Sequence, residues 1–240
     1  MHGEKFVDMR TRLAAIEALS VVKRWWGQKR VAETLGVSPS VLSRYSNGRT
    51  LPNRDRAETI LRYVLDEVLS GLVSSLIRRT GDGLYDLTVP MRDPSLLKLI
   101  AVTAFTTFKD VRITKVLTVA TDGIPCATVV ASEIGAELVV AKDWKDPIYD
   151  EFLEEKIVRS PPVVEYLYVP RRALRRNDNV IIVDDVIRSG RTVAALYRIA
   201  TRSGANVVGV FALASIADSI EKLRTELGVK CPVKVLVNLG

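Results

Sequence analysis

Two adjacent acidic residues, Asp184 and Asp185, follow a short apolar run and precede a small polar loop. The run Val180–Val183 reads VIIV and predicts a buried strand, and in the loop Arg188–Thr192 (RSGRT) Gly190 allows a tight turn into a helix. Ligands of open parallel sheets bind at the carboxyl ends of the strands. Carboxylates there accept hydrogen bonds from sugar hydroxyls, while the free amides and the dipole of a helix N-terminus hold a phosphate. The spacing therefore predicts a sugar-phosphate site.

The alternative for this segment is an ordinary strand, turn and helix with incidental acids. Two adjacent carboxylates at the end of a buried strand are costly unless something binds them, which favours the site. The loop is not a nucleotide-binding P-loop, because no Gly-x-x-x-x-Gly-Lys-Ser/Thr occurs in the chain.

A second group of residues, within Gln28–Asn53, has the pattern of a helical hairpin. Gly36 suits the left-handed end of a short helix, and Ser38 followed by Pro39 suits the start of the next. Two short helices joined in this way place the second one in the major groove of DNA. The alternative is a helical hairpin with a solvated basic face.

The distribution of charge favours the DNA interpretation. The 240 residues carry a net charge of +7. Residues 1–80 hold 14 basic and 8 acidic side chains, a net of +6, whereas residues 81–240 hold 21 and 20, a net of +1. This asymmetry indicates that the N-terminal third meets a polyanion and that the remainder has another task.

Around these residues the chain divides into two kinds of sequence. Helical periodicity runs through 1–80 and stops at Gly81-Asp82-Gly83, after which short apolar runs alternate with helical stretches. We therefore predict a helical DNA-binding domain (1–80) and an α/β domain with a mainly parallel sheet (81–240). The predicted strands are Ile113–Ala120, Ala136–Ala141, Tyr166–Val169, Val180–Val183, Val207–Leu213 and Val233–Val237.

One predicted helix, Arg54–Arg79, has apolar pairs every four residues. On an α-helix that repeat drifts by about 40° per step, so the apolar stripe spirals. Either its two ends pack against different partners or the helix is buried on several sides.

The segment VIIVDDVIRSGRT resembles the signature of type I phosphoribosyltransferases, which bind phosphoribosyl diphosphate (PRPP), and the likeness extends over residues 90–240. Thr118–Ala127 (TVATDGIPCA) is similar to the pyrophosphate loop of that family, and Lys142 to a basic residue that reaches the pyrophosphate, sometimes across a dimer. The resemblance implies that PRPP or a phosphoribosyl nucleotide binds, with Mg²⁺ accompanying PRPP. The residues implied to bind it are Asp122, Gly123, Lys142, Asp184, Asp185, Arg188, Ser189, Gly190, Arg191 and Thr192.

The hairpin segment resembles the helix-turn-helix of repressor and Cro-like proteins. This likeness implies base or phosphate contacts from the second helix and backbone contacts beside it. The residues are Lys29, Ser38, Ser40, Ser43, Arg44 and Arg49. A helix-turn-helix ahead of a phosphoribosyltransferase domain is similar to the bacterial purine-operon repressor and, most closely, to the archaeal GfcR-type regulators. Such proteins imply a homodimer on double-stranded DNA.

The chain departs from the enzymes in the acidic segment Asp143–Glu165, which corresponds to their mobile, glycine- or serine-rich lid. It contains no glycine, 7 acids and 3 bases. Such a segment stabilises departing pyrophosphate poorly, so the catalytic residues stay unassigned and little turnover is expected. Three functions remain open: a ligand-responsive regulator, an active phosphoribosyltransferase with an appended DNA-binding domain, and a DNA binder without a sensing role.

Composition and terminal sequence predict the compartment. Met1–Arg12 mixes charges of both signs, and no apolar run reaches the length of a membrane span. The two cysteines, Cys126 and Cys231, are expected to be free thiols in a reducing cytoplasm. His2 is the one histidine, which excludes multi-histidine metal sites and histidine catalysis.

Overall fold

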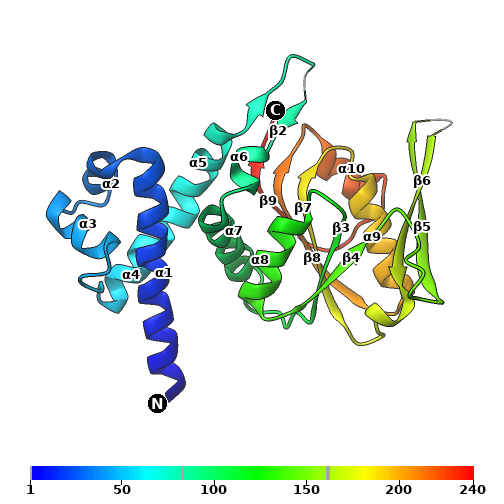
Figure 1. The fold of residues 1–240 in the computed structure, drawn as a ribbon, viewed down its shortest axis with the longest axis horizontal. Helices are drawn as coiled ribbons and strands as arrows, with labels where there is room; N and C mark the ends of the chain where they lie inside the picture. Colours follow the sequence, from blue (N-terminus) through cyan, green and yellow to red (C-terminus); the bar gives the residue numbers. More distant parts are fainter. Residues whose placement is uncertain (1, 83, 161–162) are drawn as a thin grey trace. The chain divides into compact units, whose positions relative to one another are not determined.

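The computed structural model describes residues 2–82, 84–160 and 163–240 (Figure 1). The chain forms two compact units, Met1–Leu99 and Ile100–Gly240. Residues 81–99, which the change of sequence pattern had grouped with the second domain, thus belong to the first unit. Within the described residues, no helix has both the length and the apolar character needed to cross a bilayer.

The first unit is built mainly of helices. α1 packs against α2, α3 and α4, and Ala15, Ala18 and Leu19 of α1 are fully buried. The small alanine side chains let the helices approach closely. The elements of this unit are α1 (His2–Trp26), α2 (Gln28–Thr34), α3 (Pro39–Ser46), α4 (Arg54–Tyr63), the π-helical turn η1 (Val64–Val68), α5 (Leu69–Leu76), β1 (Arg78–Arg79), β2 (Tyr85–Asp86) and α6 (Thr88–Met91), with α7 (Pro94–Thr107) crossing the boundary between units.

The predicted helix Arg54–Arg79 is shorter than expected and is not α-helical throughout. It ends at Leu76, and Arg78–Arg79 form β1, which pairs antiparallel with β2. Ile60, Val64 and Val68, four residues apart, are all buried. The π turn explains this, because its hydrogen bonds span five residues and its wider turn rotates the apolar stripe back toward the core.

The second unit contains the predicted parallel sheet, in the order β4-β3-β7-β8-β9, and every neighbouring pair is parallel. The α/β fold class is therefore confirmed. The sheet strands are β3 (Lys115–Val119), β4 (Glu137–Ala141), β7 (Asn179–Ile187), β8 (Asn206–Ser215) and β9 (Val233–Asn238). The other elements are α8 (Ile124–Ile134), β5 (Phe152–Ser160), β6 (Val163–Pro170), the 3-10 turn η2 (Arg171–Ala173), α9 (Arg191–Arg202) and α10 (Ser219–Thr225).

The central strand β7 carries the acidic pair. Its residues Val180 to Val183 have no exposed surface, so both faces of the strand are covered, as a parallel sheet requires. α9 contributes Val193, Leu196 and Ile199 to the core on one of these faces. β7 continues four residues beyond the predicted strand, to Ile187, so Asp184 and Asp185 lie within its last part and not after its end, near the carboxyl edge of the sheet.

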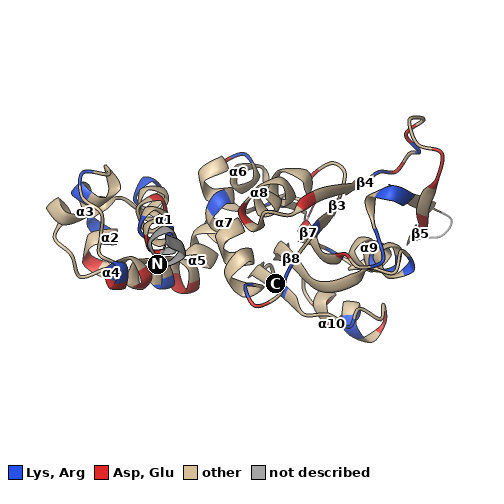
Figure 2. Ribbon diagram, turned by 90° about the horizontal axis from the view of Figure 1, so that it is seen from below, with Lys and Arg blue, Asp and Glu red and all other residues tan. Residues whose placement is uncertain are grey.

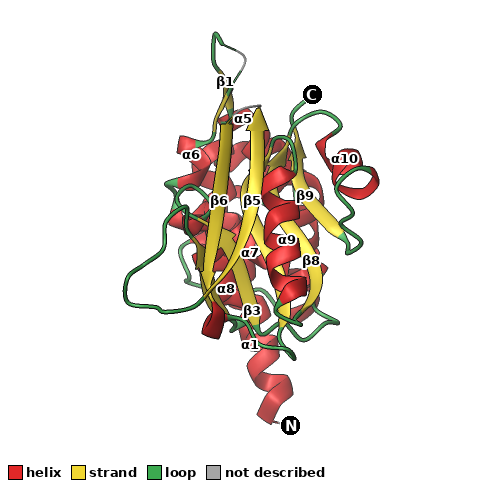
Figure 3. Cartoon of the chain, turned by 90° about the vertical axis from the view of Figure 1, so that its right-hand side faces the viewer, coloured by secondary structure: helices red, strands yellow, loops and turns green. Residues whose placement is uncertain are grey.

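The acidic segment forms much of an antiparallel hairpin, β5–β6, which lies beside α9 (Figure 3). Ile157, Leu167 and Val169 of the hairpin are buried in the core. The sequence indicated only Tyr166–Val169 as strand. Glutamate and lysine have low strand propensity, so β5 owes its conformation to cross-strand pairing and to packing on α9.

Candidate functional site

A pocket of about 320 Å³ lies at the carboxyl ends of β3 and β7. Both loops that the sequence singled out contribute to it. The predicted ligand-binding residues that line it are Asp122, Gly123, Asp184, Asp185, Arg188, Ser189, Gly190 and Thr192. Arg191 and Lys142 are not part of its lining. The pocket therefore joins three acids, two glycines and the N-terminus of a helix, which are groups that can bind the hydroxyls and the phosphate of a sugar phosphate.

The two carboxylates lie in different environments. Asp184 is 5% exposed, and its Oδ1 accepts a hydrogen bond from the amide of Asp185 at 3.0 Å. Burial raises the pKa of Asp185; the hydrogen bond with Asp184 opposes this, and the charge of Asp122 adds to it. The ionised form of Asp185 is thus disfavoured until a hydrogen-bond donor or a cation enters the pocket.

Gly190 shapes the phosphate side of the pocket for two reasons. Its φ of +74° is left-handed, and a Cβ at this position would lie 2.7 Å from Cγ of Leu223. It precedes α9, a twelve-residue helix whose first amides have no partner within the helix. These amides and the helix dipole favour an anion beside Ser189 and Thr192.

The opposite wall is the loop between β3 and α8. Its Ala120–Thr121 peptide bond is cis. At Gly123 a Cβ would lie 2.5 Å from Oγ1 of Thr118 and 3.3 Å from Oδ1 of Asp184, so only glycine allows this close approach.

Six residues that line the pocket were not among the predicted site residues: Val119, Ala120, Thr121, Val186, Ile187 and Val193. Thr118 lies beneath the loop, and among the described side chains its hydroxyl is buried without a hydrogen-bond partner. Thr118, Ala120 and Thr121 belong to the segment Thr118–Ala127, and its resemblance to a pyrophosphate loop was the available signal.

Lys142 does not reach the pocket in the single chain. Its Nζ lies 3.0 Å from Oδ2 of Asp146 and 4.3 Å from the ring centroid of Trp144. Its backbone bridges to Tyr168. The physical reason is topological: Lys142 follows the edge strand β4, and β3 separates that strand from β7.

The acidic segment has contacts with α9, and none of its described residues lines the pocket. Glu155 forms ion pairs with Arg198 at 2.7 Å and Arg202 at 2.6 Å, both on α9. Arg191, the first residue of α9, donates to the carbonyl oxygen of Val158 at 2.9 Å. Asp146 and Glu154 pair with lysines. Three acids of the segment, Asp146, Glu154 and Glu155, are therefore matched by cations, and Glu155 joins the hairpin to α9.

In the first unit, the turn between α2 and α3 has the predicted chemistry. The φ of Gly36 is +60°, and the amides of Gly36 and Val37 bond to the carbonyls of Glu33 and Ala32, which is a Schellman motif. The Ser38 hydroxyl accepts from the amide of Val41 at 3.3 Å, with Pro39 at the first helical position. The N-cap and the glycine turn are thus confirmed.

The side chains of α3 and its flanks expose several polar groups. The Ser38 and Ser40 hydroxyls are 3.0 Å apart, and Ser43 accepts a weak bond from Asn47. Gln28 donates to the carbonyl oxygen of Pro39 at 2.9 Å, which joins α2 to α3.

Most basic residues between 23 and 56 already have partners in the fold. These pairs are Lys23 with Ser46, Arg24 with Asp93, Arg30 with Trp26, Arg54 with Glu58 and Arg56 with the carbonyl of Leu35. Among the described residues, the side chains of Lys29, Arg44 and Arg49 have no such partner and are exposed. Figure 2 shows where the charged positions lie on the ribbon. Three of the six residues predicted to contact DNA are therefore cations that the fold does not use.

Comparison with known proteins agrees with both units. The phosphoribosyl transferase domain model matches residues 93–235, and a helix-turn-helix model matches residues 26–64. Hypoxanthine/guanine phosphoribosyltransferase of Methanosarcina mazei is 30% identical over 182 residues, which are 74% of this chain and 93% of that protein. The purine biosynthesis transcriptional repressor PurR of Bacillus subtilis is 25% identical over 88% of this chain and 72% of its own length.

A solved structure shows the same fold. Adenine phosphoribosyltransferase from Rhodothermus marinus superposes with a TM-score of 0.65 at 24% identity, covering 72% of this chain and all of that chain. Together with the geometry of the pocket, the family match leads to one conclusion. The chain belongs to the phosphoribosyltransferase domain family and carries a helix-turn-helix ahead of that domain.

Proposed function

We propose that the protein is a DNA-binding transcriptional regulator that senses PRPP or a phosphoribosyl nucleotide. The observation that carries this proposal is the presence, in one chain, of an acid- and glycine-lined pocket at the carboxyl edge of the sheet and of a helix-turn-helix in which three exposed cations have no partner among the described residues. The similarity to the Bacillus subtilis repressor over most of the chain supports it. The archaeal GfcR-type group remains our prediction for the nearer relationship.

The pocket offers a partner for each part of PRPP. Asp184 and Asp185 accept bonds from the ribose hydroxyls, and the segment Arg188–Thr192 holds the 5′-phosphate with backbone amides and the α9 dipole. The amides around Asp122 and Gly123 face the diphosphate.

We expect Mg²⁺ to bind in this pocket only together with the ligand. Among the described residues, no group of three or more acidic, histidine or cysteine side chains gathers in metal-binding geometry. The ion prefers to keep waters and to bind one or two carboxylates together with phosphate oxygens. Burial and the nearby charge of Asp122 raise the pKa of Asp185, and such a cation would stabilise the ionised form of its carboxylate. Bound there, Mg²⁺ would supply charge neutralisation for the diphosphate.

The DNA-binding unit acts as part of a homodimer in the cytoplasm. One recognition helix reads only a few base pairs, so two-fold symmetry would place half-sites about one helical turn, or a multiple of it, apart. A ligand that prefers one arrangement of the dimer changes DNA affinity, and a coupling of about 1–3 kcal/mol suffices for regulation.

The direct test measures DNA affinity with and without ligand. A DNA site is first selected by the full-length protein from a random pool, and its affinity is then measured at fixed salt with PRPP, with nucleotides and with neither. We expect at least one of these ligands to change the affinity about fivefold or more. Equal affinity under all conditions would refute the sensing role.

An active phosphoribosyltransferase is the second candidate, and the identity with the Methanosarcina mazei enzyme favours it. We nevertheless expect pyrophosphate release from PRPP to stay below roughly 1 per second with hypoxanthine, guanine, adenine, xanthine or orotate. The reason is that the segment Asp143–Glu165, which corresponds to the lid of the enzymes, contains no glycine and is acidic, so it stabilises departing pyrophosphate poorly. Sustained turnover at ordinary enzyme rates would make the enzyme the better description.

Ligand affinity should also depend on pH through Asp185. Ribose hydroxyls and Mg²⁺ prefer the ionised carboxylate, and burial raises the pKa of Asp185, so affinity for PRPP should fall as the pH falls through that raised pKa. Calorimetric titrations between pH 8 and pH 5 measure this. The variant Asp185→Asn retains the titration of the ligand's own phosphates, so its pH profile should be flatter than that of the wild type. Parallel profiles would assign the dependence to the ligand alone.

A further inference from the structure

A group of arginines lies at the amino edge of the parallel sheet, opposite the edge that holds the sugar-phosphate pocket. The neighbouring strands β3 and β7 are parallel, so the segments that lead into them lie at the same edge. Arg112 lies in the segment before β3, and Arg175 and Arg176 lie in the segment before β7; all three are exposed. These three residues form the arginine edge.

The arginine edge lies in segments with an excess of positive charge. Residues 109–114 hold two bases and one acid, and residues 171–178 hold four bases and one acid, so together they have a net charge of +4. The net charge of +1 over residues 81–240 conceals this excess, because acids gather at the pocket, where Asp122, Asp184 and Asp185 lie. The second unit therefore places bases at its amino edge and acids at its carboxyl edge.

Hydrogen bonds hold the backbone of the arginine edge and occupy the acid within it. The Asp178 amide donates to the carbonyl oxygen of Arg175 at 3.1 Å, and the side-chain amide of Asn179 donates to the carbonyl oxygen of Arg112 at 2.7 Å. The carboxylate of Asp178 accepts from the Arg175 amide at 2.8 Å and from the Thr114 hydroxyl at 2.9 Å. Among the residues that the structure describes, no carboxylate pairs with the guanidinium groups of the arginine edge.

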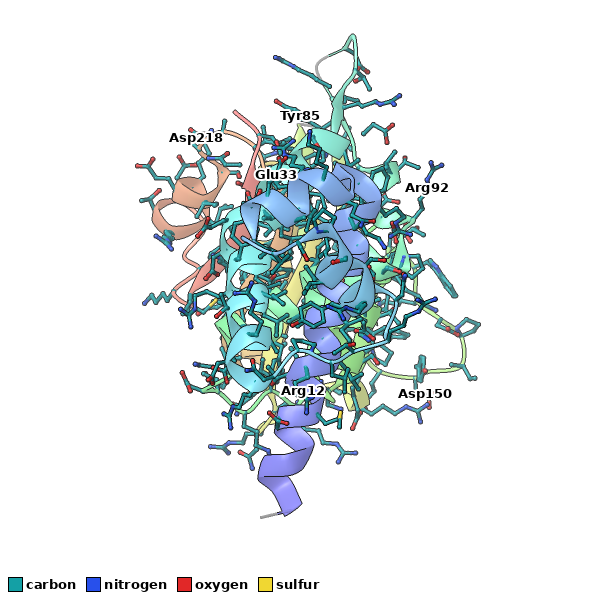
Figure 4. The ribbon with its side chains drawn as sticks, turned by 90° about the vertical axis from the view of Figure 1, so that its left-hand side faces the viewer. Arg12, Glu33, Tyr85, Arg92, Asp150 and Asp218 are labelled. Atoms are coloured by element: carbon teal, nitrogen blue, oxygen red, sulfur yellow. The ribbon has the colours of Figure 1, made fainter. Side chains whose placement is uncertain are left out.

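Two further arginines, Arg171 and Arg172, precede the arginine edge in the chain but have acids close by. They line a cavity of about 290 Å³ together with Glu151 and with Asp150, which is labelled in Figure 4. The guanidinium group of Arg172 also lies 4.5 Å from the ring centroid of Tyr149. The positive charge is therefore least compensated at the arginine edge itself.

The chemistry of the arginine edge indicates the kind of partner. Guanidinium groups without acidic partners suit phosphates, which accept two N–H bonds from one arginine. Apart from Val111, residues 109–112 and 171–178 expose no large apolar side chain, and Leu174 is buried. The core of a protein interface is apolar, and single-stranded nucleic acid is held by stacking on aromatic rings. The arginine edge therefore fits the phosphate backbone of a duplex better than either of these.

We propose that the arginine edge of the second unit binds phosphates of the same double-stranded DNA that the helix-turn-helix binds. The inference rests on the proposed DNA-binding function and adds a second contact to it, one that does not read sequence. Contacts to phosphate raise the affinity for every DNA sequence and make that affinity depend on salt. Both units of the chain thus contribute to DNA affinity, and α3 supplies the sequence preference.

The test measures DNA affinity of the full-length protein over a range of salt concentrations. The duplex carries the selected site and extends about two helical turns beyond it on each side, and a second duplex of equal length has an unrelated sequence. Arg175→Gln/Arg176→Gln removes two charges but keeps most of each stem, including the part of Arg176 that lies beside Gly204. This variant should bind both duplexes about tenfold more weakly near 0.1 M salt and reduce the slope of log affinity against log salt by about two.

Two further variants separate the loss of charge at this edge from other effects. Arg175→Lys/Arg176→Lys keeps both charges and should retain most of the salt dependence. Lys156→Gln/Arg224→Gln removes two exposed charges from β5 and α10, away from the arginine edge, and should bind both duplexes as the wild type does.

The proposal is overturned if Arg175→Gln/Arg176→Gln leaves the salt slope unchanged, or if the Lys156/Arg224 control or the lysine variant loses as much affinity as it does. It is also overturned if the glutamine variant weakens the binding of single-stranded RNA and leaves both duplexes unaffected. In each of these cases a preserved preference for the selected site and a preserved response to PRPP would leave the proposed function intact. If the wild type binds neither duplex, the proposed function fails, and this inference fails with it.

Discussion

Replacing both Asp184 and Asp185 by asparagine should remove the response of DNA affinity to PRPP and leave DNA affinity itself unchanged. A hydrogen bond to a charged group contributes about 1.5–3 kcal/mol, so losing two charged acceptors should weaken PRPP binding roughly a hundredfold or more. The fold should persist, because the asparagine oxygen at position 184 can still accept the bond that Oδ1 of Asp184 receives from the amide of residue 185.

The measurement combines PRPP titration with DNA binding of the same preparations. Asp218→Asn/Glu221→Gln is the matched control, because it makes the same change in net charge at exposed positions near the start of α10, outside the pocket. This control should bind PRPP and respond to it as the wild type does. If the Asp184/Asp185 variant responds normally, the sensing site lies elsewhere in the protein.

Arg44→Ala should lower affinity for the selected DNA site by about 1–3 kcal/mol if Arg44 contacts a base. Arg44 is exposed on α3, and its side chain has no partner among the described residues. Binding of DNA by Arg44 would therefore break no ion pair with a described residue of the protein. Arg62→Ala, which removes one exposed positive charge from α4, is the control for net charge and should have little effect.

The dependence on salt separates base contacts from phosphate contacts. Lys29→Ala or Arg49→Ala should weaken binding to all DNA sequences alike and reduce the slope of log affinity against log salt by about one. Arg44→Ala should relax sequence preference instead. If Arg44→Ala and Ser40→Ala both leave affinity for the selected site unchanged, α3 is not the recognition surface.

The sheet and the helical turn could be predicted because their signals are local. Left-handed backbone at Gly36 and Gly190, the N-cap at Ser38 and the buried run Val180–Val183 each depend on a few neighbouring residues. The steric limits on φ and the need of the first helical amides for a hydrogen-bond acceptor both depend on neighbouring residues. Residue types close together in the chain therefore suffice to predict these features.

The hairpin β5–β6 and the π turn were not predicted from the sequence, because both depend on residues far apart in the chain. The hairpin β5–β6 is held by cross-strand pairing and by its packing on α9, where Glu155 also pairs with Arg198 and Arg202. No periodicity within the acidic segment encodes those partners. The π turn at Val64–Val68 likewise depends on tertiary packing. It keeps the apolar residues that recur every four positions facing the core of the first unit.

By itself, the sequence determined the two kinds of domain, the carboxyl-edge acids with their glycine loop, and the turn before the second DNA-binding helix. Tertiary structure alone decided which of the proposed ligand residues share a pocket. Strand order places β3 between β4 and β7, and so directs Lys142 toward Trp144 and Asp146 instead of Asp184. Strand neighbours are chosen by packing over the whole sheet, and the same residue type therefore has a different role at the edge of the sheet than at its centre.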